Sequence, residues 1–176
     1  MNESVERRSF VKQSAVLAAA ASAFPSGVQG QSEESEKVRV ALVGCGGRGT
    51  GAAAQALAAD DRAELFAMAD INGEQLEKSR EVLQKNAPSP DQVKVDPEHR
   101  FVGLDAYRRV MDLKEIDVVL LTTPPGFRPF HFEAAVEAGK HVFMEKPVAT
   151  DAAGVRRVIE AAKISKDKDL KVGVGF

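Results

Sequence analysis

The sequence predicts an α/β protein built on a doubly wound parallel sheet of about six strands. Short apolar runs bounded by turn residues alternate with stretches of helical period from residue 38 to residue 176. The run over 116–122 is β-branched and apolar, as in strands that are buried on both faces of a parallel sheet. Ligands of such sheets bind beyond the carboxyl ends of the strands, so we expect the site there.

A glycine-rich turn follows the first expected strand directly. The strand covers 38–43, the motif G-x-G-x-x-G covers 44–49, and an alanine-rich stretch over 50–59 follows as a helix. The first glycine permits a tight turn, the second lets backbone N–H groups approach phosphates, and the third lets the helix pack closely on the sheet. The helix N-terminus adds unpaired N–H donors and a positive partial charge. We therefore predict a site for the pyrophosphate of a dinucleotide, made by Gly44, Gly46, Gly47, Arg48 and Gly49.

Asp70 ends the second apolar run and lies 21 residues beyond Gly49. A carboxylate at this place accepts hydrogen bonds from the adenosine ribose hydroxyls and repels a 2′-phosphate. The cofactor predicted is therefore NAD rather than NADP. The alternative interpretation is that Asp70 caps the next helix, with Asn72 and Gly73 forming the turn.

The remaining elements follow from periodicity and from proline and glycine positions. Gly139 is expected at the C-terminal cap of the helix over 128–138. The prolines after residue 123 end the strand over 116–122. We expect strands over 63–69, 100–102, 116–122, 141–144 and 171–176, helices over 73–85, 105–111, 128–138 and 151–165, and a loop over 91–99.

Composition excludes several function classes. The 176 residues predict one domain, or one domain plus a tail. A net charge of −2 and a pI near 6.0 give no basic surface of the kind that binds nucleic acid. A single cysteine, Cys45, excludes an intrachain disulfide; it is either a small residue that fits the turn or a reactive thiol at a helix N-terminus. His99, His131 and His141 are too dispersed to predict a metal site.

Residues 1–30 differ from the rest of the chain and predict an export signal. Arg7 and Arg8 precede a mostly alanine run over 14–24, which is too short for a permanent membrane span. The segment resembles a twin-arginine signal, from whose usual form Glu6 and Val11 depart. It implies the twin-arginine export machinery as a partner and a periplasmic or otherwise exported protein, with cleavage after residue 23 or residue 30. An amphipathic N-terminal helix is the alternative.

The predicted organisation is thus a signal and lead-in over 1–30 and a dinucleotide-binding domain over 37–176. Twin-arginine export carries folded proteins, and a protein that needs a cytoplasmic dinucleotide must fold around it before it leaves. The two predictions therefore support each other.

Four segments together resemble the Gfo/Idh/MocA family of oxidoreductases. They are the turn with its strand over 41–49, Asp70, the pair Thr123-Pro124, and the run A-G-K-H-V-F-M-E-K-P over 138–147. The resemblance implies a Rossmann-type domain and covers nearly all of 38–176.

The resemblance also implies the roles of individual residues. Thr123, Pro124 and Glu145 are expected beside the cofactor, and Lys146 is expected to be the catalytic residue. An ammonium there would hydrogen-bond the reacting hydroxyl and stabilise developing alkoxide charge while hydride moves to the nicotinamide. The alternative for Lys146 is an exposed turn lysine followed by a proline that ends the strand.

This chain departs from the family pattern in two ways. Arg128 stands where members commonly have His, and His131 lies three positions later; Arg128 is either a phosphate or substrate-hydroxyl ligand, and His131 either a site residue or a helix residue that faces the sheet. Members also carry a C-terminal α/β domain with the substrate pocket and the usual homo-oligomer interface. That domain is absent from the 176 residues, which stop at the strand leading into it.

Three function classes are carried forward. The first is an NAD-dependent oxidoreductase acting on a sugar or polyol, of which this chain is the nucleotide-binding domain. The second is an NAD-dependent glycoside hydrolase of the same family. The third is a non-catalytic dinucleotide-binding module or truncated product.

Overall fold

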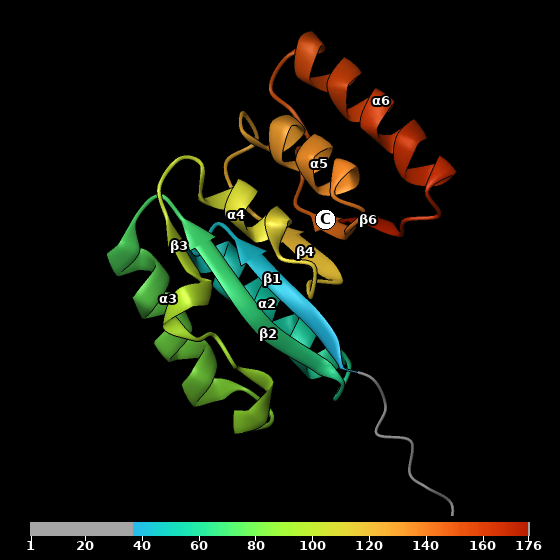
Figure 1. The fold of residues 1–176 in the computed structure, drawn as a ribbon. Coiled ribbons are helices and arrows are strands. Elements are labelled where there is room, and N and C mark those ends of the chain that lie inside the picture. The colour runs from blue at the N-terminus through green and yellow to red at the C-terminus, as the bar shows by residue number, and fades with distance from the viewer. Residues whose placement is uncertain (1–36, 176) are drawn as a thin grey trace, which may run out of the picture. The chain divides into compact units, whose positions relative to one another are not determined.

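The computed structural model describes residues 37–175, and a six-stranded sheet in which all neighbouring strands are parallel forms their centre (Figure 1). The strand order is β3-β2-β1-β4-β5-β6. The doubly wound parallel sheet predicted from the sequence is confirmed. The strands are β1 (Val38–Val43), β2 (Ala63–Asp70), β3 (Arg100–Val102), β4 (Val118–Leu121), β5 (His141–Met144) and β6 (Val172–Val174).

Five α-helices and two short 3-10 helices connect the strands within the described range. The α-helices are α2 (Gly47–Ala59), α3 (Gly73–Asn86), α4 (Ala106–Asp112), α5 (Arg128–Glu137) and α6 (Ala152–Asp167). The 3-10 helices are η2 (Pro90–Gln92) and η3 (Pro97–His99). Among residues 37–175, no helix has both the length and the apolar character needed to cross a bilayer.

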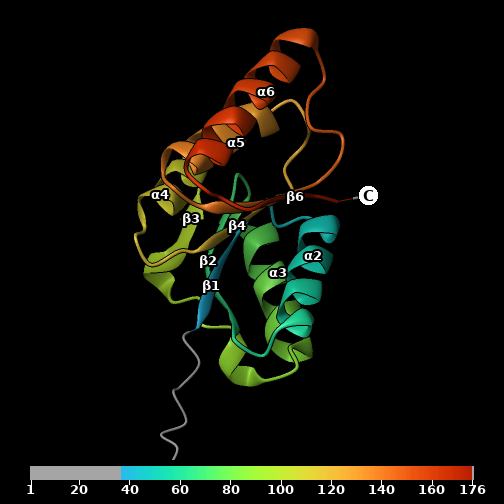
Figure 2. The ribbon, with the colours of Figure 1, turned by 90° about the vertical axis from the view of Figure 1, so that its right-hand side faces the viewer.

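The sheet separates two apolar cores, because successive side chains of a strand point to opposite faces. Val40 and Leu42 of β1 pack with α2 and α3 on one face, whereas Ala41 and Val43 pack with α4, α5 and α6 on the other. Figure 2 shows these two helix groups on opposite sides of the strands. Both faces are therefore covered, which explains why β4 and the buried residues 40–43 of β1 are apolar without alternation.

The strand order reverses at β1, which pairs with β2 on one side and with β4 on the other. The connections after β1 and β2 lead to one face of the sheet, and those after β4 and β5 lead to the opposite face. A crevice therefore opens between the diverging connections at the carboxyl ends of the strands.

Several expected boundaries were wrong by one to three residues. Helix α2 begins at Gly47 rather than at residue 50, because the last part of the glycine turn already forms its first turn. Strand β4 begins at Val118 rather than at residue 116, and Asp117 before it uses its carboxylate to accept a hydrogen bond from the Arg39 backbone N–H at 2.7 Å. Strand β6 covers Val172–Val174 of the expected 171–176, of which residue 176 lies outside the described part of the chain.

The segment 91–99, expected as a loop, contains more structure than its polarity indicated. It includes parts of η2 and η3, and Val93 forms an isolated parallel bridge with Leu65. Val93 and Val95 are buried in the core beneath α2 and α3. The sequence signal was the pair of valines on either side of Lys94, because alternate residues of an extended segment point to the same side.

Glycines at two neighbouring places in α2 differ sharply in their surroundings. A Cβ at position 49 would lie 2.0 Å from the Gly44 carbonyl oxygen and 2.6 Å from the Thr122 hydroxyl oxygen, whereas a Cβ at position 51 would meet nothing within 4 Å. Gly49 is therefore required for packing, and Gly51 is not.

We expect the Gly51→Ala variant to raise the free energy of unfolding by about 0.5–1 kcal/mol, because alanine restricts the unfolded chain and suits a helix interior. The Gly49→Ala variant should lower it by about 1–3 kcal/mol through overpacking against backbone. Urea unfolding of both variants beside the parent protein measures the difference. Equal effects at the two positions would contradict this account of the α2 packing.

Candidate dinucleotide-binding site

A cleft of about 660 Å³ lies at the carboxyl ends of β1, β2, β4 and β5. It contains all but one of the residues that the sequence singled out for the cofactor and for catalysis. Those that line it are Gly44, Gly46, Gly47, Arg48, Asp70, Thr123, Pro124, Glu145 and Lys146. The exception is Gly49, which packs beneath the cleft against the backbone of Gly44.

The glycine turn forms the floor of the cleft. Gly44 has φ of +97°, a conformation that side chains disfavour, and a Cβ there would lie 2.7 Å from the Thr123 backbone nitrogen. Cβ atoms at Gly46 and Gly47 would meet nothing within 4 Å, so the backbone there borders open space. Gly46 is the N-cap of α2 and offers no side chain to the first N–H groups of the helix. Those N–H groups are free to meet an anion.

Asp70 anchors this turn to the end of β2. One carboxylate oxygen accepts a hydrogen bond from the Cys45 backbone N–H at 2.6 Å, and the other accepts from the Asn72 backbone N–H at 2.9 Å. Asp70 is not the cap of α3: the N-cap is Asn72, whose side chain accepts from the N–H groups of Glu74 and Gln75. The carboxylate lines the cleft, where ribose hydroxyls of a dinucleotide would meet it.

Cys45 faces away from the cleft into the core beneath α2. Its side chain is fully buried, and the thiol donates a hydrogen bond to the Ala69 carbonyl oxygen at 3.5 Å. Burial and, to a lesser extent, the Asp70 carboxylate raise the pKa of this thiol. The geometry favours the interpretation of Cys45 as a small packing residue rather than as a reactive thiol.

An ion pair joins the phosphate turn to the end of β5. The Arg48 guanidinium lies 2.5 Å from a carboxylate oxygen of Glu145, whose side chain is only 6% exposed, whereas that of Arg48 is 50% exposed. The hydrogen bond with Glu145 raises the pKa of Arg48 further above its ordinary value. The charge at the α2 N-terminus is therefore partly balanced by a buried carboxylate.

Lys146 lies directly after Glu145, is exposed, and lines the cleft. The Lys146–Pro147 peptide bond is cis. Strands β4 and β5 pair in register, with Leu121 opposite Met144, so the turns that follow them are neighbours. Lys146 thereby comes beside Thr123 and Pro124 at one end of the cleft, whereas Asp70 lies at the end of β2.

Arg128 and His131 both line the cleft from α5 and are 2% and 6% exposed, respectively. The His131 ring lies 4.1 Å from that of Tyr107, centroid to centroid, and its Nδ1 is 3.0 Å from the Thr123 hydroxyl oxygen. Burial, aided by the charges of Arg128 and Arg108, lowers the pKa of His131 to about 4. His131 is therefore neutral near pH 7; it is a buried residue of α5 that also lines the cleft.

Sequence reasoning missed four apolar residues of the cleft wall. Ile71 and Leu104 line it and remain 67% and 73% exposed, and Tyr107 and Phe127 line it as well. Ile71 directly follows Asp70 and Leu104 follows shortly after β3, so an apolar residue just beyond the carboxyl end of a strand was the available signal. Exposed apolar side chains in a cleft favour a flat, partly apolar ligand.

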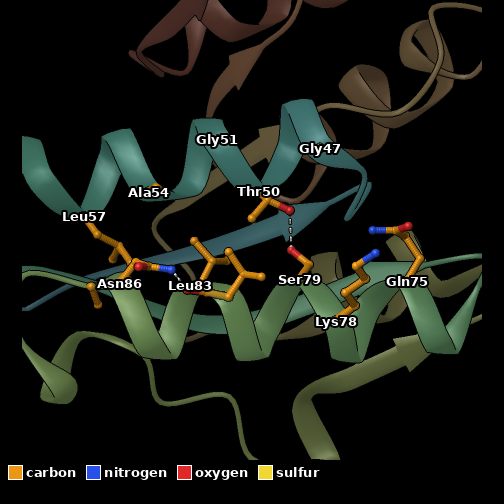
Figure 3. Close-up of a pocket in the computed structure, with 12 residues that line it drawn as sticks. Gly47, Thr50, Gly51, Ala54, Leu57, Gln75, Lys78, Ser79, Leu83 and Asn86 are labelled. Atoms are coloured by element: carbon orange, nitrogen blue, oxygen red, sulfur yellow. Dashed lines mark hydrogen bonds between the residues drawn. The ribbon is translucent and has the colours of Figure 1, made fainter.

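A second cavity, of about 480 Å³, lies between α2 and α3 (Figure 3). The Thr50 and Ser79 hydroxyls point toward one another across it, with 2.7 Å between their oxygens. Leu57 and Leu83 approach from the two helices near the opposite end. Its walls come from one layer of the fold, and it holds none of the residues that the sequence predicted for catalysis.

The residues of the first cleft fit a dinucleotide. Gly46 and Gly47 leave the backbone open at a free helix N-terminus, a carboxylate stands at the end of β2, and apolar side chains flank it. These are the features that bind the diphosphate, ribose and base of such a ligand. The fold and the site together define a nucleotide-binding domain of the Rossmann type.

Comparison with known proteins agrees. Residues 38–176 match the model of the oxidoreductase family with an NAD-binding Rossmann fold, GFO_IDH_MocA. The chain belongs to this family of oxidoreductases.

Individual relatives carry more than one activity in their names. The chain is 31% identical over 139 residues to an inositol 2-dehydrogenase of Agrobacterium fabrum, covering 79% of this chain and 37% of that protein. It is 34% identical over 116 residues to a glycosyl hydrolase family 109 protein of Streptomyces coelicolor, covering 65% and 23%. The chain thus spans less than two fifths of the length of either relative.

Among solved structures, the scyllo-inositol dehydrogenase of Lactobacillus casei with bound NAD(H) and scyllo-inositol has the same fold. The TM-score is 0.59 at 22% identity, over 80% of this chain and 36% of that one. At this identity the likeness concerns the fold alone.

The neutral state of His131 predicts a pH-dependent stability. The unfolded chain takes up a proton at this imidazole near pH 6.5, but the folded chain does so only near pH 4. The unfolded state therefore binds more protons between these values, and the free energy of unfolding falls by up to about 3 kcal/mol as the pH drops through this window.

We expect His131→Gln to remove this pH-dependent part of the free energy of unfolding. Between pH 7 and pH 4.5, urea unfolding should therefore show a smaller decrease in the free energy of unfolding for the variant than for the parent protein. A loss of the same size in both would contradict a buried neutral His131.

Proposed function

We propose that the protein is an NAD-dependent oxidoreductase that acts on a hydroxyl of a sugar or polyol, with residues 37–175 as its cofactor-binding part. One observation carries the proposal: Lys146 lies in the same cleft as the glycine turn and Asp70. A cation beside one end of a dinucleotide site is where a reacting oxygen needs a hydrogen-bond donor. The inositol 2-dehydrogenase relative supports a polyol as the substrate class.

Each residue of the cleft then has a distinct task. NAD, when bound, supplies the acceptor for a hydride from the carbon that carries the hydroxyl. The α2 N-terminus holds the negative charge of the diphosphate, and Asp70 accepts hydrogen bonds from ribose hydroxyls. Lys146 donates a hydrogen bond to the reacting oxygen and stabilises its developing negative charge. His131 stays neutral, so it adds no competing positive charge beside Lys146.

Asp70 supports NAD rather than NADP as the cofactor, because its carboxylate would repel a 2′-phosphate. We expect the parent protein to bind NADH at least tenfold more tightly than NADPH, and the Asp70→Asn variant to narrow that ratio about tenfold, which is about 1.4 kcal/mol. Calorimetric titration with both nucleotides measures it. Asp60→Asn is a matched control, since Asp60 pairs with Arg62 at the opposite end of α2. An unchanged ratio in Asp70→Asn would remove Asp70 from cofactor selection.

Lys146 is tested on the full-length protein with NAD and a panel of sugars and polyols. We expect Lys146→Met to lower kcat/KM by about 10²–10⁴, the usual range for general acid–base groups, and to leave the dissociation constant of NADH nearly unchanged. Lys163→Met is the control, because Lys163 pairs with Glu160 on α6 and lies outside the cleft. An unchanged kcat/KM in Lys146→Met would contradict the catalytic role of Lys146.

An NAD-dependent glycoside hydrolase is the second candidate, and the 34% identity to a glycosyl hydrolase family 109 protein favours it. Such an enzyme regenerates its NAD in each cycle, whereas a dehydrogenase accumulates NADH. Incubation of the full-length protein with nitrophenyl glycosides, without added NAD, distinguishes the two activities. Release of nitrophenol indicates the hydrolase, and its absence indicates the dehydrogenase.

We also propose that the protein is exported by the twin-arginine route. Residues 7–12, which carry the motif, lie outside the described part of the chain, so the sequence alone supports this step. Replacement of Arg7 and Arg8 by lysine should leave the protein in the cytoplasm of its host, and undiminished export of that variant counts against the route.

A further inference from the structure

The Arg128 guanidinium lies between the two turns that follow β4 and β5. One terminal nitrogen donates to the Pro147 carbonyl oxygen and the other donates to the Thr123 carbonyl oxygen. Pro147 follows Lys146 directly, and Thr123 begins the turn that contains Pro124. A single side chain therefore ties together the two turns that form one end of the cleft.

These contacts remove Arg128 from the roles that the sequence allowed. The sequence left it as a ligand for a phosphate or a substrate hydroxyl, but both terminal nitrogens face backbone carbonyls, and the residue is only 2% exposed. Its Nε is buried without a hydrogen-bond partner among the described residues. The side chain is thus enclosed by protein, and its donors point at the main chain.

The planar fork of arginine suits this task, and lysine does not match it. A guanidinium presents two rigid, divergent donors, so the directions to both carbonyls are set at once. A lysine ammonium is a point charge on a flexible stem and does not fix two acceptors in one plane. Burial lowers the pKa of Arg128, and the nearby Glu145 carboxylate opposes that effect, so the charge is held partly by the Glu145 that also pairs with Arg48.

We propose that Arg128 is a positioning residue that clamps the Lys146 turn against the Thr123 turn and so sets where the Lys146 ammonium stands in the cleft. The inference rests on the proposed dinucleotide function. It assigns to Arg128 the nicotinamide end of the ligand, since the glycine turn and Asp70, which receive the diphosphate and adenosine, share no contact with its guanidinium.

The test compares two ligands that differ only at that end. NADH carries the nicotinamide ring, and ADP-ribose lacks it. The clamp also holds the Thr123 turn, which lines the cleft. Because that turn would then no longer be held at the nicotinamide end, we expect Arg128→Lys in the full-length protein to raise the dissociation constant of NADH about tenfold in calorimetric titration, and that of ADP-ribose by less than about twofold. Arg157→Lys is the matched control: Arg157 pairs with Glu133 of α5 and stacks on Phe130 outside the cleft, and its replacement should change neither constant.

The possible results distinguish a failure of the Arg128 proposal from a failure of the proposed NAD-dependent function. Equal weakening of both ligands in Arg128→Lys means a general loss of structure and overturns the clamp, as does an unchanged NADH constant. Binding of neither ligand by the parent protein overturns the proposed function instead. In that case a measurement without ligand still tests whether Arg128 holds the two turns together.

That measurement is the ¹⁵N guanidinium spectrum of the parent protein, which also serves if Arg128→Lys does not fold. A clamped Arg128 has hindered rotation about its Cζ–Nη bonds and gives two resolved Nη signals. One averaged Nη signal at Arg128, as for a solvated arginine, overturns the proposal whatever the titrations show.

Discussion

The first turn of α2 reaches the carboxyl ends of β1 and β4 only because position 49 has no side chain. The space that a Cβ would need is occupied by the Gly44 carbonyl oxygen and by Thr122. Thr122 uses its hydroxyl there to donate to that carbonyl oxygen, at 2.6 Å. This packing brings the free N–H groups of the helix to the crevice between β1 and β4, where an anion can meet them.

The positive charges of the cleft do not form a single basic patch, because a buried carboxylate lies close to two of them. Arg48 at the helix N-terminus pairs with the buried Glu145, and the same carboxylate lies near the enclosed Arg128. Lys146, which is exposed like Arg48, directly follows Glu145 along the chain. A buried guanidinium or carboxylate without such compensation is costly, so the pairings allow two arginines and one lysine to share a small volume.

The fold could be predicted from the sequence because its signals are local. β-branched runs, the glycine turn and Gly139 at a helix end act within a few residues, and the structure has the strands and helices where these signals stand. The edges of elements were less predictable. At the start of β4, Asp117 accepts a hydrogen bond from Arg39, which is far from it in the sequence, and such a contact cannot be recognised from neighbouring residues.

The same distinction applies to the site. That the expected residues would meet in one cleft followed from the rule for parallel sheets, whereas Arg128 could not be interpreted from its neighbours in sequence. Its partners are two backbone carbonyls brought together by the pairing of β4 with β5, and a carbonyl leaves no mark in a sequence. Ile71 and Leu104 escaped notice for another reason, since exposed apolar residues in turns are common.

Cys45 gives this molecule an internal reporter. It is the single cysteine of the chain, it lies within the glycine turn, and its thiol is enclosed in the core with a raised pKa. A thiol reagent can reach it only when the turn lifts from the sheet, so its labelling rate counts openings of that turn. A molecule that binds to the turn lowers the labelling rate by a factor that is set by the ratio of its free concentration to its dissociation constant. The chain thus allows occupancy of the cleft to be followed by chemistry at an atom that no ligand touches.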